Sequence, residues 1–155
     1  MNKLAVVRIR GEPDLKKEVK DTLKMLNLER TNQCTVINDE PTYRGMLDRC
    51  KEAVTWGSLD SEVLKKLLLE RGEFDGGKEI TDENVEERTP FGSVEELVET
   101  VYEEDLDLSD IDNLKPMFRL HPPKKGYNSV TRSFGNGGSK GFRGEKINDL
   151  ILRMI

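Results

Sequence analysis

The sequence predicts one mixed α/β (α+β) domain: a small sheet with helices packed on it, followed by added helices and a basic, glycine-rich extension. Short β-branched runs alternate with amphipathic stretches over residues 1–59, in the order strand, helix, strand, helix, strand. Residues 60–114 hold further amphipathic stretches, and residues 115–155 combine a short strand, a glycine-rich stretch and an apolar end. A length of 155 residues suits a single domain with extensions.

The first 59 residues contain three predicted strands and two predicted helices. The run "KLAVVRIRG" predicts a strand at residues 3–11, and β-branched runs predict two more at residues 32–39 and 53–57. Apolar residues recur at helical spacing in residues 14–28 and 42–54, which predicts two amphipathic helices. Their inward side chains should be Leu15, Val19, Leu23 and Leu26 in the first helix and Tyr43, Met46, Leu47 and Cys50 in the second.

The remaining elements follow the same patterns. Apolar stripes predict helices at residues 60–72 and 93–105, and the second of these begins with Ser and Glu in capping-box spacing. Residues 72–92 are rich in Gly, Glu and Asp, so we expect a surface connection with a short helix near Val85. A fourth strand is expected before the prolines at 122 and 123, and the last eleven residues should form a helix that packs back on the core.

Charge divides the chain into the same three segments. Residues 1–59, the core segment, hold 11 Lys and Arg and 9 Asp and Glu. Residues 60–114, the acidic segment, hold 5 Lys and Arg and 19 Asp and Glu. Residues 115–155, the basic segment, hold 9 Lys and Arg and 2 Asp and Glu. The net charge of −5 therefore originates in the middle of the chain. This distribution would let the two outer segments face a polyanion while the acidic segment points away from it.

The stretch "RLHPPKKGYNSVTRSFGNGGSKGFRG", residues 119–144, is the strongest candidate for contact with RNA. Basic side chains neutralise phosphates, aromatic rings stack on unpaired bases, and glycines let the backbone approach folded RNA closely. Few apolar residues are present, so we expect disorder without RNA, and removal of this end should leave the stability of the core unchanged. The candidate RNA-binding residues are Arg119, His121, Lys124, Lys125, Tyr127, Arg132, Phe134, Lys140, Phe142 and Arg143.

Further candidate RNA contacts lie in the core segment. Arg8 and Arg10 share one face of the first strand, where they would contact phosphates if that face meets RNA and would be ordinary if it meets solvent. Lys16 and Lys20 lie opposite the apolar stripe of the first helix, on a face that could be solvated or could meet RNA.

Arg44 and Gly45 are unusual residues for the first turns of a helix. The helix dipole disfavours a cation at Arg44, so we expect an anionic partner or a pair with Asp39 or Glu40. Glycine inside a helix costs about 1 kcal/mol relative to alanine. Close approach of a partner backbone would explain Gly45, and so would tight packing of the helix on the sheet.

Several classes of protein are not expected. No apolar run approaches the ~20 residues that span a bilayer, and arginines interrupt the apolar N-terminal run, so we expect no membrane contact and no signal peptide. Cys34 and Cys50 are too few for a disulfide framework or zinc site and should be buried thiols. His121 is the only histidine, and no nucleophile has a recognisable base, so neither a metal nor a catalytic residue is assigned.

The glycine-rich run "GNGGSKG" raises two alternative functions: a small α/β regulatory module that binds an anionic ligand, and a nucleotide-dependent enzyme. A phosphate-binding P-loop needs Lys followed by Ser or Thr, whereas Lys140 is followed by Gly141. We therefore expect no enzymatic activity and no cofactor.

Two motifs of the core segment resemble those of the large-subunit ribosomal protein thirty family. A Thr-Leu-x-x-Leu-x-Leu helix end lies at Thr22 to Leu28, and an Arg-Gly-Met helix start lies at Arg44 to Met46. The match covers residues 4–57, and the acidic continuation with "RLHPPKKGY" is similar to the archaeal form. Asn27 stands where many bacterial members have Gly, and both suit the end of a helix.

The resemblance implies a small strand-helix-strand-helix-strand sandwich, similar to half of a ferredoxin-like fold. It also implies a structural role in the cytoplasmic ribosome, with large-subunit ribosomal RNA, neighbouring ribosomal proteins and also 5S ribosomal RNA as partners. Neither DNA nor a membrane is an expected partner. By this resemblance the core segment is an RNA-binding unit, and the basic segment extends the RNA contact.

Overall fold

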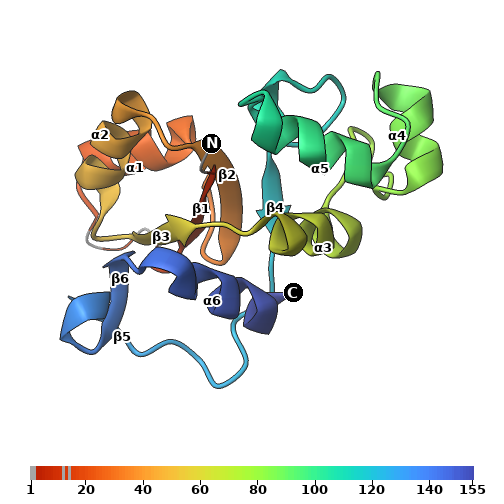
Figure 1. Cartoon of the computed structure of the whole chain (residues 1–155). Helices are drawn as coiled ribbons and strands as arrows, with labels where there is room; N and C mark the ends of the chain where they lie inside the picture. Colours follow the sequence, from red (N-terminus) through yellow and green to blue (C-terminus); the bar gives the residue numbers. More distant parts are fainter. Residues whose placement is uncertain (1–2, 12, 14) are drawn as a thin grey trace.

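The computed structural model describes residues 3–11, 13 and 15–155 and has the predicted mixed α/β fold (Figure 1). The strands are β1 (Lys3–Arg8), β2 (Gln33–Asn38), β3 (Val54–Ser58), β4 (Met117–Arg119), β5 (Ser129–Ser133) and β6 (Gly138–Phe142). The helices are α1 (Lys17–Met25), α2 (Pro41–Cys50), α3 (Ser61–Arg71), α4 (Asp82–Arg88), α5 (Val94–Glu103) and α6 (Ile147–Met154). Among the described residues, no helix is both long and apolar enough to cross a membrane.

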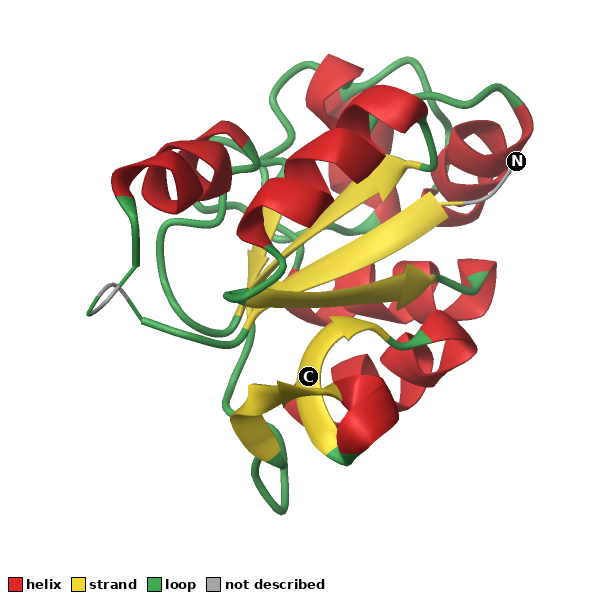
Figure 2. Cartoon of the chain, turned by 90° about the vertical axis from the view of Figure 1, so that its left-hand side faces the viewer, coloured by secondary structure: helices red, strands yellow, loops and turns green. Residues whose placement is uncertain are grey.

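The six strands form one sheet in the order β4-β2-β1-β3-β6-β5. β1 is antiparallel to both β2 and β3, and β4 is antiparallel to β2, whereas β6 joins β3 in parallel. Helices lie on both sides of this sheet (Figure 2). β1 and β2 are buried on both faces and consist of buried residues throughout, whereas Trp56 and Ser58 of β3 are partly exposed.

One face of the sheet packs against α1 and α2. Leu4 and Val6 of β1 meet the predicted apolar stripes of both helices there, and Tyr43, Met46 and Trp56 are partly buried at the margin. α1 ends where predicted: Asn27 takes a left-handed φ of 62°. The Leu28 N–H donates to the Leu23 carbonyl at 2.8 Å and the Asn27 N–H to the Lys24 carbonyl at 3.0 Å, which is the Schellman arrangement that closes helix ends.

The opposite face carries the larger core. Ala5 and Val7 of β1 pack there with apolar residues of α3, α5 and α6, so the core, acidic and basic segments all contribute. The stretch 72–92, expected as a surface connection, also contributes, because Phe74, Ile80 and Val85 are buried. The predicted short helix is α4, which contains Val85. Both cysteines are buried free thiols, as expected.

The basic segment folds onto the edge of the sheet as β5 and β6, whereas the sequence-based expectation was disorder without RNA. Arg143, expected to contact phosphate, is only 8% exposed. Its Nε donates to Thr55 Oγ1 and its Nη2 donates to the Ser139 carbonyl, each at 2.7 Å, and its guanidinium lies 4.8 Å from the centre of the Phe134 ring. These contacts, rather than apolar burial alone, hold β6 against β3.

The C-terminal helix completes the larger core, because Ile147, Leu150, Ile151 and Met154 are buried there. Removal of every residue after Leu120 would therefore expose the core face that α6 covers. The expectation that this truncation leaves the stability of the core unchanged is thus wrong. The docking of α6 also requires Gly57, since a Cβ atom there would lie 1.9 Å from the Gly144 carbonyl oxygen.

Gly57→Ala should lower the free energy of unfolding by about 3 kcal/mol, because the added methyl group collides with backbone that cannot move independently. Gly45→Ala is the matched control: its Cβ would meet nothing within 4 Å, and alanine should stabilise α2 by about 1 kcal/mol. Urea unfolding followed by circular dichroism measures both. Equal effects of the two substitutions would contradict the close approach of β3 to residue 144.

Arg143→Ala should cost about 1.5–3 kcal/mol, since the buried guanidinium hydrogen bonds to Thr55 and Ser139 are lost. Amide hydrogen exchange should show faster exchange in β6, with less change in β1 and β2. Arg132→Ala, at an exposed position of β5, should change stability by less than about 0.5 kcal/mol. If the two variants exchange alike, Arg143 does not hold the extension in place.

Candidate nucleic-acid interface

The register of the strands brings several distant loops to one end of the sheet, which we call the basic end. Arg8, the last residue of β1, pairs with Val54 at the start of β3, and Val7 pairs with Cys34 near the start of β2. Gln33 in turn pairs with Arg119, the last residue of β4. The loops that follow β1 and β4 and those that precede β2 and β3 therefore meet there.

Backbone and side-chain hydrogen bonds tie these loops together around Asn32. The Asn32 N–H donates to the Arg8 carbonyl at 2.7 Å, and the Leu120 N–H donates to the Asn32 carbonyl at 3.2 Å. The Tyr127 hydroxyl donates to Asn32 Oδ1 at 2.7 Å. The Lys124 N–H donates to the Arg153 carbonyl at 3.1 Å, which joins the end of α6 to the same assembly.

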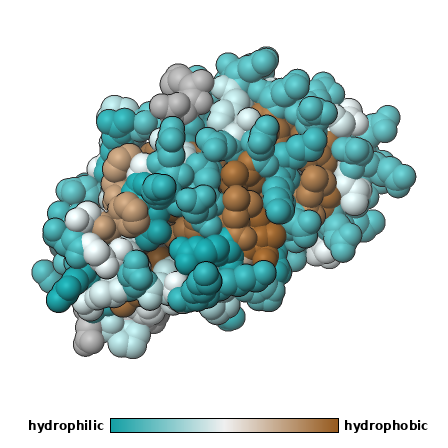
Figure 3. All heavy atoms as spheres, turned by 60° about the horizontal axis from the view of Figure 1, so that its bottom comes forward, coloured by the Kyte–Doolittle hydropathy of each residue, from teal (hydrophilic) through white to brown (hydrophobic). Residues whose placement is uncertain are grey.

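Cations dominate the exposed positions of the basic end. Arg30, Arg119, Lys124 and Lys125 are exposed, and Arg10 is half-buried. His121 is also exposed, and its backbone N–H donates to the Met154 carbonyl at 2.9 Å. The surface seen from below in Figure 3 is mostly hydrophilic, with apolar patches between the polar groups. The exposed cations, rather than the hydropathy of the surface, favour contact with a polyanion.

Two adjoining hollows lead across this end. The first, of about 310 Å³, is lined by Arg8, Lys20, Asp21, Lys24, Leu28, Glu29 and Arg30. The second, of about 420 Å³, is lined by residues 29–33 and by Met117, Arg119 and Leu120. Glu29 and Arg30 line both hollows, so the two hollows adjoin each other. The hollows bring Lys20 of α1 together with Arg119 of β4, two residues far apart in the sequence.

Arg8 does not project from the sheet, so the expectation of a surface position for it is wrong. It is 3% exposed, and it donates from Nε to the Arg10 carbonyl and from Nη1 to the Leu28 carbonyl, each at 2.9 Å. Carbonyl oxygens that follow β1 and α1 accept these bonds. Arg8 thus fixes the loops that carry Arg10 and Arg30, and its own contact with RNA would require those loops to open.

The three aromatic residues of the extension occupy different environments. Tyr127 packs against the larger core, and burial raises the pKa of its hydroxyl well above the ordinary value. Phe134 is half-buried beneath the Arg143 guanidinium. Phe142 is 58% exposed, with its ring 6.4 Å from that of Trp56. Of the three rings expected to stack on bases, only Phe142 offers most of its surface.

The remaining predicted cations are spread over other surfaces. Lys16 is exposed just before α1, Arg132 is exposed on β5, and Lys140 is half-buried on β6. Arg44 lies at the start of α2, which follows the far end of β2, and it pairs with Asp39 through Nε at 2.5 Å and Nη2 at 2.8 Å. The expected carboxylate pair is thereby confirmed, and Arg44 is not part of the basic end.

The opposite end of the sheet, which we call the acidic end, is lined with carboxylates. Lys3 is buried there, hydrogen bonded to Asn38 Oδ1 and, at 2.8 Å, to the Leu106 carbonyl. Burial lowers the Lys3 pKa, while Asp107 and Asp105 oppose that shift. The Tyr43 hydroxyl donates to Asp107 at 2.9 Å, which ties α2 to the acidic segment. Charge is thus separated along the strands, positive at one end and negative at the other.

Arg30 and Arg153 were missed as candidate residues. Arg30 lies in the exposed loop between α1 and β2, and Arg153 donates from Nη1 to the Lys124 carbonyl at 3.3 Å. Sequence patterns place both in ordinary polar surroundings. The signal for Arg30 is its position three residues before β2, an antiparallel partner of β1, which brings it into one hollow with Arg8.

Comparison with known proteins identifies the family to which the chain belongs. Residues 4–54 match the family described as ribosomal protein L30p/L7e. The large ribosomal subunit protein uL30 of Methanosphaera stadtmanae is 46% identical over 97% of this chain and 99% of its own length. The proteins of that name from Methanopyrus kandleri and Archaeoglobus fulgidus are 44% and 43% identical, over 95% and 97% of this chain and over 100% and 98% of their own lengths.

These relatives share the acidic and basic segments as well as the core segment, because each alignment spans nearly the whole chain. Their identities lie well above the level at which only a fold is shared. The chain therefore belongs to the ribosomal protein L30p/L7e family and, within it, aligns over 95–97% of its length with these archaeal uL30 proteins.

Proposed function

We propose that the chain is a structural constituent of the large ribosomal subunit that binds and stabilises ribosomal RNA. Its partners are large-subunit ribosomal RNA and neighbouring ribosomal proteins, and its place in the cell is the cytoplasmic ribosome. It acts in translation as a structural protein and not as an enzyme.

The separation of charge along the strands is the observation that supports a particular orientation on RNA. In this proposal the basic end faces RNA, with Arg10, Lys20, Arg119, Lys124 and Lys125 contacting phosphates. Contacts of this kind position a protein without reading sequence. Lys16, His121, Arg132 and Lys140 extend the contact along α1 and the extension. Buried Arg8 and Arg143 support the surface from beneath it.

The acidic segment faces the other way in this proposal. α3 and α5 form a hollow lined by Glu62, Glu95, Glu99 and Glu103, with Lys65 as its one cation, and its net negative charge would keep RNA phosphates away from these two helices. The three segments then correspond to three roles: an RNA-binding core at residues 1–59, an acidic cover at 60–114, and an RNA-contacting extension with its helix at 115–155.

The alternatives of a ligand-binding regulatory module and a nucleotide-dependent enzyme are not supported by the family. A P-loop lies between a strand and the helix that follows it, whereas the glycine-rich run here lies before β6 and within it. As finer proposals, 5S ribosomal RNA is a second RNA partner, and DNA is not a ligand.

Binding of deproteinised large-subunit ribosomal RNA should weaken steeply with salt, because each neutralised phosphate contributes about −0.7 to −0.9 to the slope of log K against log salt. Lys124→Gln/Lys125→Gln should make that slope shallower by about 1.4–1.8. Filter binding at a series of potassium chloride concentrations measures it. Duplex DNA and 5S ribosomal RNA, tested as competitors, examine the two finer proposals.

The matched control is Lys66→Gln/Lys78→Gln, which removes two exposed cations of the acidic segment. Both double variants remove two positive charges. A general loss of long-range attraction between protein and RNA would therefore affect them alike. We expect its slope to stay within experimental error of the wild-type slope. If both pairs change the slope equally, the basic end is not the RNA-facing surface.

A further inference from the structure

Phe142, which is exposed, and Trp56, which is partly buried, form an aromatic pair outside the basic end. They are direct cross-strand partners in the parallel pairing of β3 with β6, and their ring planes are tilted by 54°. Phe142 is the only aromatic side chain among the large hydrophobic residues that the described part of the chain leaves exposed. The two rings together offer an aromatic surface on which a planar group can stack.

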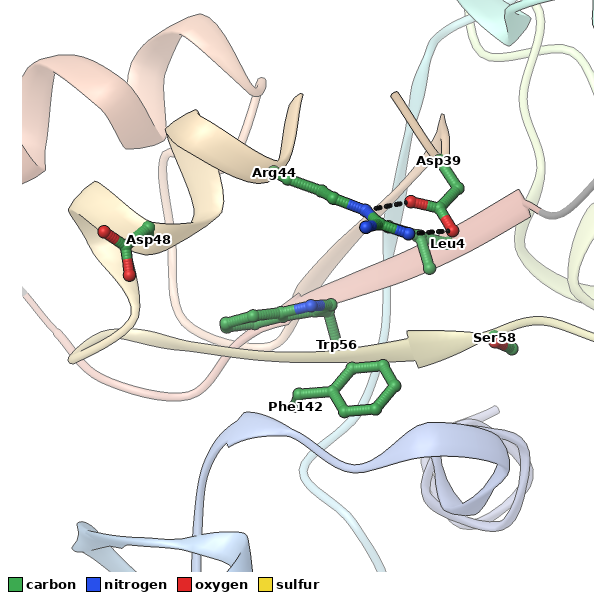
Figure 4. Close-up of a pocket in the computed structure, with 7 residues that line it drawn as sticks. All are labelled: Leu4, Asp39, Arg44, Asp48, Trp56, Ser58 and Phe142. Carbon is green, nitrogen blue, oxygen red and sulfur yellow. Dashed lines mark hydrogen bonds and ion pairs between the residues drawn. The ribbon is translucent and has the colours of Figure 1, made fainter. Parts of the chain in front are cut away.

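The pair forms the floor of a hollow of about 370 Å³ between α2 and the extension. Leu4, Asp39, Arg44, Asp48 and Ser58 complete its lining. In Figure 4 the indole of Trp56 lies between Arg44 on one side and Phe142 on the other, so an aromatic surface and a guanidinium face the same space. The rings suit a flat ligand, and Arg44 is the one cation of the lining, beside the carboxylates of Asp39 and Asp48.

Asp39 fixes the orientation of Arg44 and leaves part of its guanidinium available. Asp39 accepts hydrogen bonds from Nε and Nη2, and the contact lowers the pKa of its carboxyl group, so it remains ionised. Arginine has five N–H donors, so both hydrogens of Nη1 and one of Nη2 are not used by this pair. The Arg44 side chain is 67% exposed, and these donors can therefore reach an anion at the rim of the hollow.

Gly45 provides a second indication that a partner approaches α2 at this place. It is exposed in the helix, and a Cβ atom there would meet nothing within 4 Å, so packing on the sheet does not require glycine. The open space beside Gly45 leaves room for a partner backbone to approach α2 closely.

We propose that this hollow binds one unstacked nucleobase of the ribosomal RNA. The base stacks on Trp56 and Phe142, and Arg44 donates to the phosphate of the same nucleotide. The inference rests on the proposed function, because it assumes that ribosomal RNA is the partner. Aromatic side chains exposed on sheets bind unpaired bases of single-stranded RNA in this manner.

The size of the site favours a base over a neighbouring protein. Stable protein–protein interfaces bury about 1,200–2,000 Å² in total. Here the exposed apolar surface consists mainly of two rings, since Leu4 is itself 3% exposed. The Arg44 donors and the exposed Gly45 further suit a phosphodiester backbone that passes close to α2.

The intrinsic fluorescence of the full-length protein tests this proposal, because Trp56 is the only tryptophan of the chain. Titration with deproteinised large-subunit ribosomal RNA should quench Trp56 emission as the base stacks. Phe142→Ala should reduce the quenching at saturation and weaken binding about tenfold, within the range measured for loss of one stacking ring. Phe142→Tyr should keep both properties, and Arg44→Gln should weaken binding while quenching at saturation persists.

Leu69→Ala is the matched control, since Leu69 is an exposed apolar residue of α3 that does not line the hollow. It should bind RNA and quench as the wild type does. If the wild type binds RNA with unchanged Trp56 emission and Phe142→Ala binds equally well, the base site is refuted while the proposed function stands. If the wild type binds no ribosomal RNA, the proposed function itself fails. Quenching only within the intact large subunit would assign the hollow to a neighbouring protein and refute the base site.

Discussion

The antiparallel register of β1 with β2 and β3 is the constraint on which the charge distribution depends. Arg8 opposite Val54 and Lys3 opposite Asn38 fix which loops lie at each end of the sheet. A shift of one residue in the pairing would move every side chain of a strand to the other face of the sheet, where it would meet the wrong neighbours. The same register gathers Arg30, Arg119 and Lys124 at one end and Asp105 and Asp107 at the other. The proposed orientation on RNA is a consequence of strand pairing.

Three buried cations hold this arrangement together, and all three donate to backbone carbonyls. Lys3 bonds to Leu106, Arg8 to Leu28 and Arg10, and Arg143 to Ser139. A buried charge is tolerated only where hydrogen bonds replace its hydration, and no buried side-chain nitrogen or oxygen among the described residues lacks a partner. Lys3 and Arg8 each join a strand to a loop, and Arg143 joins the end of β6 to Thr55 of β3. The exposed cations that would meet RNA are therefore carried by loops that buried cations position.

Sequence patterns predicted the helices and the first four strands because periodicity is local information. The stripe of α1 and its left-handed end at Asn27 need no knowledge of distant residues. The pairing of β6 with β3 was not predictable in this way, since it depends on Arg143 meeting Thr55 across the sheet. Arg8 was misplaced for the same reason: its burial depends on carbonyls supplied by other loops. The hollow at Trp56 likewise combines α2, β3 and β6, and Arg44 and Phe142 were foreseen only as separate contacts.

Amine labelling of the native large subunit, compared with the free protein, tests the orientation on RNA most directly. If the basic end faces RNA, Lys20, Lys124 and Lys125 should react in the free protein and become protected in the subunit. Lys66, in the acidic segment, should lose less reactivity than these three. Equal labelling of the three basic-end lysines in both states, with protection confined to the acidic segment, would show that the basic end does not face RNA.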